Sequence, residues 1–173
     1  QFSIERIGKS GAKFDYEKAK FFNQQYLKKQ DNKILAKYLL SILKEKELNF
    51  SEKYVEKVCG AVKEKCTFLN DIWNESQYFF IPPTQYDEKV LQKKWNENSI
   101  MIFQKLIEKF NSLTEWSFQN IETTVKEMET QEQKKVDMQL LRVLVTGVSH
   151  GAMLFLALEI LGKEETVKRL EKI

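Results

Sequence analysis

The chain has 173 residues, of which 42% are hydrophobic and 31% are charged, as is typical of a globular protein with one domain or two small ones. Its uninterrupted apolar runs are only a few residues long, whereas a membrane-spanning helix needs about 20, so we expect no association with a membrane. The sequence lacks the basic and then apolar N-terminal segment that would indicate secretion, and its two cysteines are too few for a disulfide framework. We therefore expect a cytoplasmic protein.

Apolar residues at spacings of three and four predict a series of helices in the first half of the chain. Asp15 and Ser51 are candidate N-caps for two of them. Pro82-Pro83 ends the series, because proline disfavours the helical conformation in its predecessor and donates no backbone hydrogen bond. The predicted apolar faces are Ala19, Phe22 and Tyr26; Ile34, Leu35, Tyr38, Leu39, Ile42 and Leu43; Val55, Val58 and Val62; and Phe68, Leu69, Ile72 and Trp73.

A second series of helices is predicted after the proline pair. Ser99 and Ser117 are its candidate N-caps, and three short helices separated by Gly147, Gly151 and Gly162 close the chain. The apolar faces are Val90, Leu91 and Trp95; Phe103, Leu106, Ile107 and Phe110; and Ile121, Val125 and Met128. No segment alternates polar and apolar residues at period two. The sequence therefore predicts an all-α fold of two packed helical units, with the proline pair between them.

Residue types of a catalytic or metal site are scarce. His150 is the only histidine, and the simpler interpretation is a turn histidine without a catalytic role, because a triad would need further residues in a specific geometry. Cys59, Cys66 and His150 provide at most three nitrogen or sulfur ligands, whereas a zinc site takes four. Residues 8–10 (Gly-Lys-Ser) lack the first glycine of a phosphate-binding loop, whose position Ser3 occupies. We therefore predict no catalytic and no metal-binding residues in this chain.

The basic residues suggest recognition rather than catalysis. A net charge of +3 is compatible with nucleic-acid binding without being evidence for it. Only Arg6, Arg142 and Arg169 are arginines, and Arg142 stands out because apolar residues flank it on both sides. Its planar guanidinium suits bases and phosphates. Candidate phosphate contacts are Lys63, Lys65, Lys93, Lys94, Lys134, Lys135 and Arg142, and candidate stacking partners for bases are Trp73, Tyr78, Phe79 and Trp95.

Four segments, in a fixed order, resemble the C-terminal region of bacterial glutamyl-tRNA synthetases. Residues 14–18 (Phe-Asp-Tyr-Glu-Lys) with 22–27 (Phe-Asn-Gln-Gln-Tyr-Leu) are similar to a Phe-Asp-x-x-Lys…Asn-x-x-Tyr stretch of that family. Residues 63–69 and the aromatic residues 78–80 resemble parts of its first anticodon-binding domain. The C-terminal series resembles the second: residues 139–147, then 149–151 (Ser-His-Gly), then 161–171, which begin Leu-Gly-Lys-Glu-Glu.

The resemblance implies an anticodon-binding body in which residues 1–30 end the stem-contact region. Residues 31–84 would form a first helical domain and residues 85–173 a second. Members of the family join glutamate to its tRNA using ATP, but their HIGH-like and KMSKS-like motifs do not occur here, and the chain begins with Gln1 rather than Met. We therefore expect a non-catalytic part of a longer glutamate–tRNA ligase, with ATP bound elsewhere. The expected partner is the anticodon loop of glutamate-accepting tRNA, bound by a monomer.

The expected tRNA-binding residues are Lys63, Lys65, Lys135 and Arg142. The resemblance puts Arg142 close to the anticodon, and Lys65 where several relatives carry an arginine that reads the third anticodon base. An ammonium cannot reproduce the paired hydrogen bonds of a guanidinium, which leaves the discrimination between glutamate and glutamine tRNAs open. The alternative role for Arg142 is a helix-end salt bridge.

Two other functions compete with RNA binding. A helical protein-interaction module would use the amphipathic faces to dock a partner, and an exposed apolar groove would favour it. Clustering of the four basic residues on one folded face would favour RNA binding. A small all-α enzyme is disfavoured, because the sequence lacks a clear set of acid, base or metal-binding residues.

Overall fold

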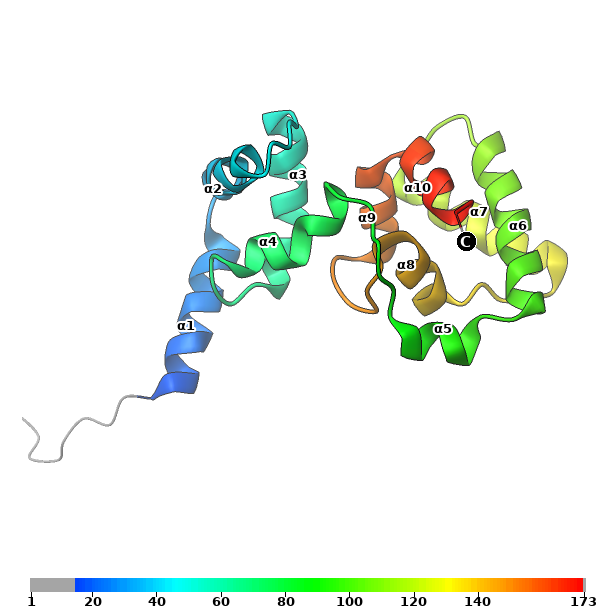
Figure 1. Cartoon of the computed structure of the whole chain (residues 1–173), viewed down its shortest axis with the longest axis horizontal. Helices are drawn as coiled ribbons and strands as arrows, with labels where there is room; N and C mark the ends of the chain where they lie inside the picture. The colour runs from blue at the N-terminus through cyan, green and yellow to red at the C-terminus, as the bar shows by residue number, and fades with distance from the viewer. Residues whose placement is uncertain (1–14, 173) are drawn as a thin grey trace, which may run out of the picture.

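The computed structural model describes residues 15–172, and every regular element in that range is a helix, which confirms the predicted all-α class. None of these helices combines the length and the apolar character that crossing a membrane requires. Phe14 and the Gly-Lys-Ser sequence at residues 8–10 lie outside the described range. The α-helices and two short 3-10 helices (η) are, in chain order (Figure 1), α1 (Tyr16–Lys29), α2 (Asn32–Glu45), α3 (Glu52–Val62), η2 (Lys63–Lys65), α4 (Asp71–Ser76), η3 (Gln77–Phe79), α5 (Glu88–Lys94), α6 (Glu97–Ser112), α7 (Phe118–Glu132), α8 (Met138–Thr146), α9 (Leu154–Leu161) and α10 (Lys163–Leu170).

Most of the predicted helix starts are confirmed. The side chains of Asp15, Ser51 and Ser117 each accept a hydrogen bond from the backbone N–H three residues later. The prediction for Ser99 is wrong, because Asn96 caps α6. The Asn96 side chain accepts from the Ser99 N–H at 3.1 Å, and the Ser99 hydroxyl accepts from the Asn96 N–H at 2.9 Å. Ser99 is therefore the third helical residue of a reciprocal capping box.

Helices α2, α3 and α4 pack together and bury most of their predicted apolar faces. Ile34 differs, since it is 54% exposed at the start of α2. Phe68 and Leu69 differ too, because α4 begins only at Asp71. The Asp71 carboxylate accepts hydrogen bonds from the N–H groups of Thr67 and Phe68, so the chain turns before the helix and leaves Phe68 and Leu69 exposed.

Helix α1 extends away from the other helices and packs mainly against η2 (Figure 1). Leu27 is its buried residue. The aromatic residues Phe22 and Tyr26, predicted to share a face with Ala19, are exposed in the described structure.

The predicted break at Pro82-Pro83 is confirmed, because no helix lies between η3 and α5. In the second group of helices, α6 and α7 pack on each other, α9 packs on α7, and α10 packs on α6, α8 and α9. Their cores contain the predicted residues Phe103, Leu106 and Phe110, and Ile121, Val125 and Met128. The three short C-terminal helices are found as expected, with Gly147 ending α8 and Gly162 separating α9 from α10.

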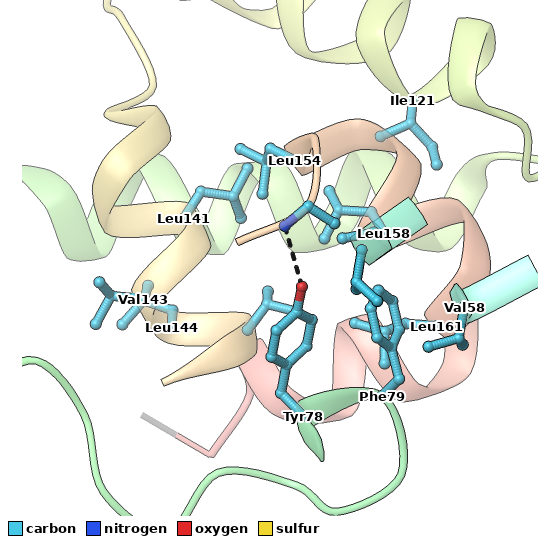
Figure 2. Close-up of a cluster of buried hydrophobic side chains, with 14 of the residues drawn as sticks. Val58, Tyr78, Phe79, Ile121, Leu141, Val143, Leu144, Leu154, Leu158 and Leu161 are labelled. Atoms are coloured by element: carbon cyan, nitrogen blue, oxygen red, sulfur yellow. Dashed lines mark hydrogen bonds between the residues drawn. The ribbon is translucent and has the colours of Figure 1, made fainter. Parts of the chain in front are cut away.

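The two groups of helices meet at η3 and share one continuous core. Tyr78 and Phe79 point from η3 into apolar side chains that come from several helices (Figure 2). These side chains include Val58 of α3, Leu141, Val143 and Leu144 of α8, and Leu154, Leu158 and Leu161 of α9. Helix α9 also packs directly on α3. The junction therefore fixes the C-terminal turns relative to α3 and α4.

Candidate nucleic-acid interface

Arg142 lies on α8 and supports the turn that follows this helix. The helix is apolar on most of its surface and is capped by Asp137, whose carboxylate accepts from the Leu140 N–H at 2.9 Å. The Arg142 side chain is half-buried, and its Nη1 donates to the backbone carbonyl of Ala152 at 2.6 Å. Burial lowers the pKa of the guanidinium below its ordinary value, while the nearby Tyr78 acts in the opposite direction. Within the described residues, Arg142 thus binds a backbone carbonyl rather than the carboxylate that the alternative role, a helix-end salt bridge, would require.

The turn between α8 and α9, residues 147–153, has a buried side and an exposed side. Gly147 begins it in the left-handed region, with φ of 82°, and accepts from the Asp87 N–H at 2.9 Å. Ala152 is buried, whereas His150 is exposed and Met153 is 64% exposed. A hydrogen bond from the Ser149 side chain lowers the pKa of the Asp87 carboxyl group. The turn is therefore ordered by its neighbours while still presenting side chains to the outside.

A hollow of about 320 Å³ lies beside this turn. It is lined on one side by Thr146, Gly147, Val148 and His150, and on the other by residues of α4, η3 and the proline-containing connection. The hollow thus joins the two groups of helices at their junction. Its open and partly polar walls are compatible with contacts to an extended ligand.

Lys63 and Lys65 belong to η2, which packs on α1, but their environments differ. The Lys63 ammonium donates to the carbonyl of Gln30 at 3.1 Å and so satisfies a carbonyl at the end of α1. The Lys65 side chain is exposed. The loop after it is held in place by Asn23 of α1, which donates to the Thr67 carbonyl, and by the Asp71 turn. Lys65 therefore stands next to a fixed loop with its ammonium available to a ligand.

Lys135 is exposed in the connection between α7 and α8. It lines a hollow beside the start of α6 together with Lys94, whose ammonium pairs with Asp137 at 2.8 Å. This connection lies close to α5 and α6, far along the molecule from α1 and α3 (Figure 1). The four predicted residues thus lie on separate elements: Lys63 and Lys65 in η2, Arg142 in α8, and Lys135 in the connection between α7 and α8.

The predicted stacking residues are mostly part of the core. Tyr78 and Phe79 are buried, which excludes them as stacking partners in this conformation. Trp73 stacks on Phe80 with a centroid distance of 6.3 Å, and the Lys46 ammonium lies 4.8 Å from its ring. Trp95 packs against Phe103. Aromatic residues at helical spacing are common in cores, and here that simpler explanation holds for these residues.

Arg169 is the arginine whose part the sequence did not reveal. It is only 2% exposed, and its Nη1 donates to the carbonyls of Tyr78 at 2.8 Å and Val145 at 2.9 Å. Its Nε pairs with Glu165 at 2.7 Å. Arg169 thus ties α10 to both η3 and α8. Arginine is as scarce around Arg169 as around Arg142, but Arg169 stands among charged residues in the sequence, a pattern typical of an exposed face.

Metal-binding clusters and reactive thiols, two features of reactive sites, are both absent from the described range. No group of three or more histidine, cysteine or acidic residues comes together within residues 15–172 in a way that could hold a metal ion. Cys59 and Cys66 are buried and free, and burial raises the pKa of each thiol to about 12, so neither is an activated nucleophile.

Comparisons with known proteins agree with the resemblance seen in the sequence. A family model described as an anticodon binding domain matches residues 24–173. The glutamate–tRNA ligase of Flavobacterium psychrophilum is 42% identical over 99% of the chain, and that of Flavobacterium johnsoniae is 38% identical over 99%. The crystal structure of a glutamate tRNA ligase from Elizabethkingia meningosepticum is similar over 99% of the chain, with a TM-score of 0.89 and 32% identity. In each case the chain spans 34% of the length of the relative.

Proposed function

The chain belongs to the family of anticodon-binding domains, and from this premise we propose that it reads the anticodon loop of glutamate-accepting tRNA as part of a glutamate–tRNA ligase. The match of the family model to residues 24–173 carries the proposal. The choice of glutamate as the amino acid, and of a tRNA ligase as the class of enzyme, rests on the relatives, which are named as glutamate–tRNA ligases.

Two surfaces are suited to contact the RNA. Bases in a single-stranded RNA loop are unstacked, so a protein can contact their edges and faces, which it cannot do in a duplex stem. Lys65 is exposed beside a fixed loop that also presents Phe68 and Leu69. The turn at residues 147–153 presents His150 and Met153 next to Arg142. We assign tRNA contacts to Lys65 and Arg142, and weaker phosphate contacts to Lys135. Lys63 acts mainly through the position it gives to η2.

In this proposal, aminoacylation takes place in a part of the parent protein outside this chain, which corresponds to the part of the relatives that the chain does not cover. The chain spans 34% of the relatives' length, and it has no motif for ATP. ATP and glutamate would therefore bind outside this chain. Isolated residues 1–173 should give glutamate-dependent pyrophosphate exchange no greater than a control without protein.

We also propose the division into residues 1–30, 31–84 and 85–173, a monomeric state and a cytoplasmic location. The unbroken packing of α2, α3 and α4, followed by the connection that contains Pro82-Pro83, supports the boundary near residue 84. The buried free cysteines are compatible with a reducing compartment. Analytical ultracentrifugation of the chain would test the monomer.

A protein-docking surface is the second candidate function, and one observation favours it. Phe21, Phe22 and Tyr26 are exposed along α1, and such a face suits packing against protein better than contact with RNA. This surface is separate from Arg142 and from the turn that follows α8 (Figure 1). The two functions are therefore compatible within one chain.

Binding measurements with two tRNAs test the proposal. Glutamate tRNA and the same tRNA with an unrelated anticodon would be compared at several salt concentrations. We expect weak, micromolar or poorer binding that favours the native anticodon and weakens as salt rises, because phosphate contacts release counterions. Equal binding of the two tRNAs, or binding that does not depend on salt, would favour the docking function instead.

A further inference from the structure

Ala152, in the turn between α8 and α9, is held on both of its backbone polar groups. Its carbonyl accepts from Arg142 Nη1 at 2.6 Å, and its N–H donates to the Tyr78 hydroxyl oxygen at 3.3 Å (Figure 2, dashed line). Arg142 comes from the preceding helix, whereas Tyr78 comes from η3, in the other group of helices. The Tyr78 bond is thus a direct tie between the turn and the end of the α1–α4 group.

Tyr78 is itself fixed, so its hydroxyl has a defined position. Tyr78 is 5% exposed, and its ring packs on the ring of Phe79 with a centroid distance of 4.5 Å. Its own backbone carbonyl accepts from Arg169 at 2.8 Å, and the same Arg169 nitrogen donates to Val145 in the last turn of α8. Two residues therefore connect η3 to the segment 145–152: Arg169 bonds to Val145 at its start, and the Tyr78 hydroxyl bonds to Ala152 at its end.

Gly151, the residue before Ala152, leaves room for the Tyr78 hydroxyl because it has no side chain. Gly151 has φ of 125°, a conformation that other residues rarely adopt, and a Cβ at this position would lie 3.0 Å from the Tyr78 hydroxyl oxygen. A side chain here would therefore push the hydroxyl away from the Ala152 N–H. The buried side of the turn is built around this one hydroxyl, while His150 and Met153 face outward.

We propose that the Tyr78 hydroxyl is a positioning group for anticodon recognition, which holds the turn at residues 147–153 in place relative to the loop beside Lys65. The inference rests on the proposed function and deepens it. The tRNA-contacting surfaces on the two groups of helices keep a fixed spacing because Tyr78 ties the second surface to the first group. Tyr78 contacts no RNA; it acts through the backbone of Ala152.

Tyr78→Phe tests this role because it removes the hydroxyl and keeps the ring. The rate of hydrogen exchange of the Ala152 amide, measured by NMR, reports on the hydrogen bond between this amide and the Tyr78 hydroxyl in the absence of RNA. We expect exchange about five- to tenfold faster than in the unchanged chain, as the loss of one hydrogen bond predicts. The second readout is the ratio of affinities for glutamate tRNA and for the same tRNA with an unrelated anticodon. This ratio should fall severalfold, while the dependence of binding on salt stays the same.

Tyr54→Phe is the matched control. The Tyr54 hydroxyl likewise bonds to one backbone group, but as a donor: it donates to the carbonyl of Phe79 in η3 at 3.0 Å, whereas the Tyr78 hydroxyl accepts from the Ala152 N–H of the turn. Tyr54→Phe should lower the melting temperature about as much as Tyr78→Phe does, but it should keep both the protection of the Ala152 amide from exchange and the preference for the native anticodon.

The outcomes separate this inference from the function on which it rests. An unchanged chain that binds both tRNAs equally overturns the proposed function, whatever the exchange experiment gives. If the unchanged chain prefers the native anticodon, the positioning role is wrong when Tyr78→Phe keeps the Ala152 protection. It is equally wrong when the protection is lost but the anticodon preference stays, or when Tyr54→Phe lowers the preference to the same extent.

Discussion

Arg169 donates from its Nη1 to the backbone carbonyl of Tyr78, 91 positions earlier in the chain, at a distance of 2.8 Å. The same nitrogen donates to Val145, and Nε pairs with Glu165, so the buried charge is compensated on several sides. A buried arginine without such partners would be costly. Arg169 therefore fixes α10 against η3 and α8, at the junction between the two groups of helices.

Replacing Arg169 with methionine should destabilise the chain strongly. The methionine keeps much of the apolar stem but leaves the carbonyls of Tyr78 and Val145 without their donor, which we expect to lower the free energy of unfolding by about 3 kcal/mol. Urea denaturation measures this loss. Lys168→Met on the same helix is the control, because Lys168 is exposed, and its effect should stay within about 0.5 kcal/mol. Equal losses for the two variants would contradict the role given to Arg169.

Gly147 and Gln133 allow a paired test of the left-handed helix ends. Gly147 has φ of 82°, and a Cβ there would lie 2.7 Å from the Gln85 carbonyl oxygen. Gly147→Ala should therefore lower the free energy of unfolding by about 2 kcal/mol or more. Gln133 ends α7 with φ of 51°, so Gln133→Gly should raise it by up to about 1 kcal/mol. Thermal melting of both variants would measure these changes, and shifts of the same sign would refute the argument.

The two cysteines should be unreactive in the folded chain. Both thiols are buried, and burial raises their pKa from 9.0 to about 12, so thiolate is scarce at pH 8. Iodoacetamide at pH 8 should therefore leave Cys59 and Cys66 unmodified under native conditions and label both in denaturant. Intact-mass spectrometry follows the labelling over time. Fast native labelling of either residue would mean that the packing around α3 opens readily.

The parts of this structure that the sequence predicted are those set by local rules. Asp15, Ser51 and Ser117 cap helices because a short polar side chain directly precedes an apolar period, and Pro82-Pro83 stops a helix by its own geometry. The prediction for Ser99 is wrong because Asn96 and Ser99 form a reciprocal capping box at the start of the same helix, and in the sequence either one alone resembles an N-cap.

Contacts between residues far apart in the sequence were not predictable in this way. Tyr78 was a candidate for base stacking, but its ring is buried, because the tertiary packing of η3 decides its exposure. The contacts of Arg169 with Tyr78 and Val145 likewise depend on how α10 folds back. The resemblance to a family indicated which segments matter. It did not distinguish Lys63, which binds the end of α1, from the exposed Lys65.

That distinction gives a test on two neighbouring lysines. Lys65→Ala should leave the melting temperature unchanged, because the side chain is exposed, and should reduce the slope of log affinity for tRNA against log salt by about one. Lys63→Ala should lower the melting temperature, because the Gln30 carbonyl loses its donor. Lys65→Arg in the parent enzyme should sharpen the preference for glutamate over glutamine tRNA, since a guanidinium can bind a base edge with two hydrogen bonds. A salt slope unchanged in Lys65→Ala would remove Lys65 from the interface.

Arg142 combines a structural bond with a proposed RNA contact, and two substitutions in the parent enzyme separate them. Arg142→Ala removes both, so we expect a lower melting temperature together with a loss of about 1–3 kcal/mol in tRNA recognition. Arg142→Lys keeps a cationic donor for the Ala152 carbonyl but loses the planar fork, so it should melt close to the unchanged enzyme and still recognise tRNA poorly. Aminoacylation efficiency and melting temperature would be measured for each variant. If Arg142→Ala melts early while its tRNA kinetics stay normal, Arg142 supports the turn and does not read the anticodon.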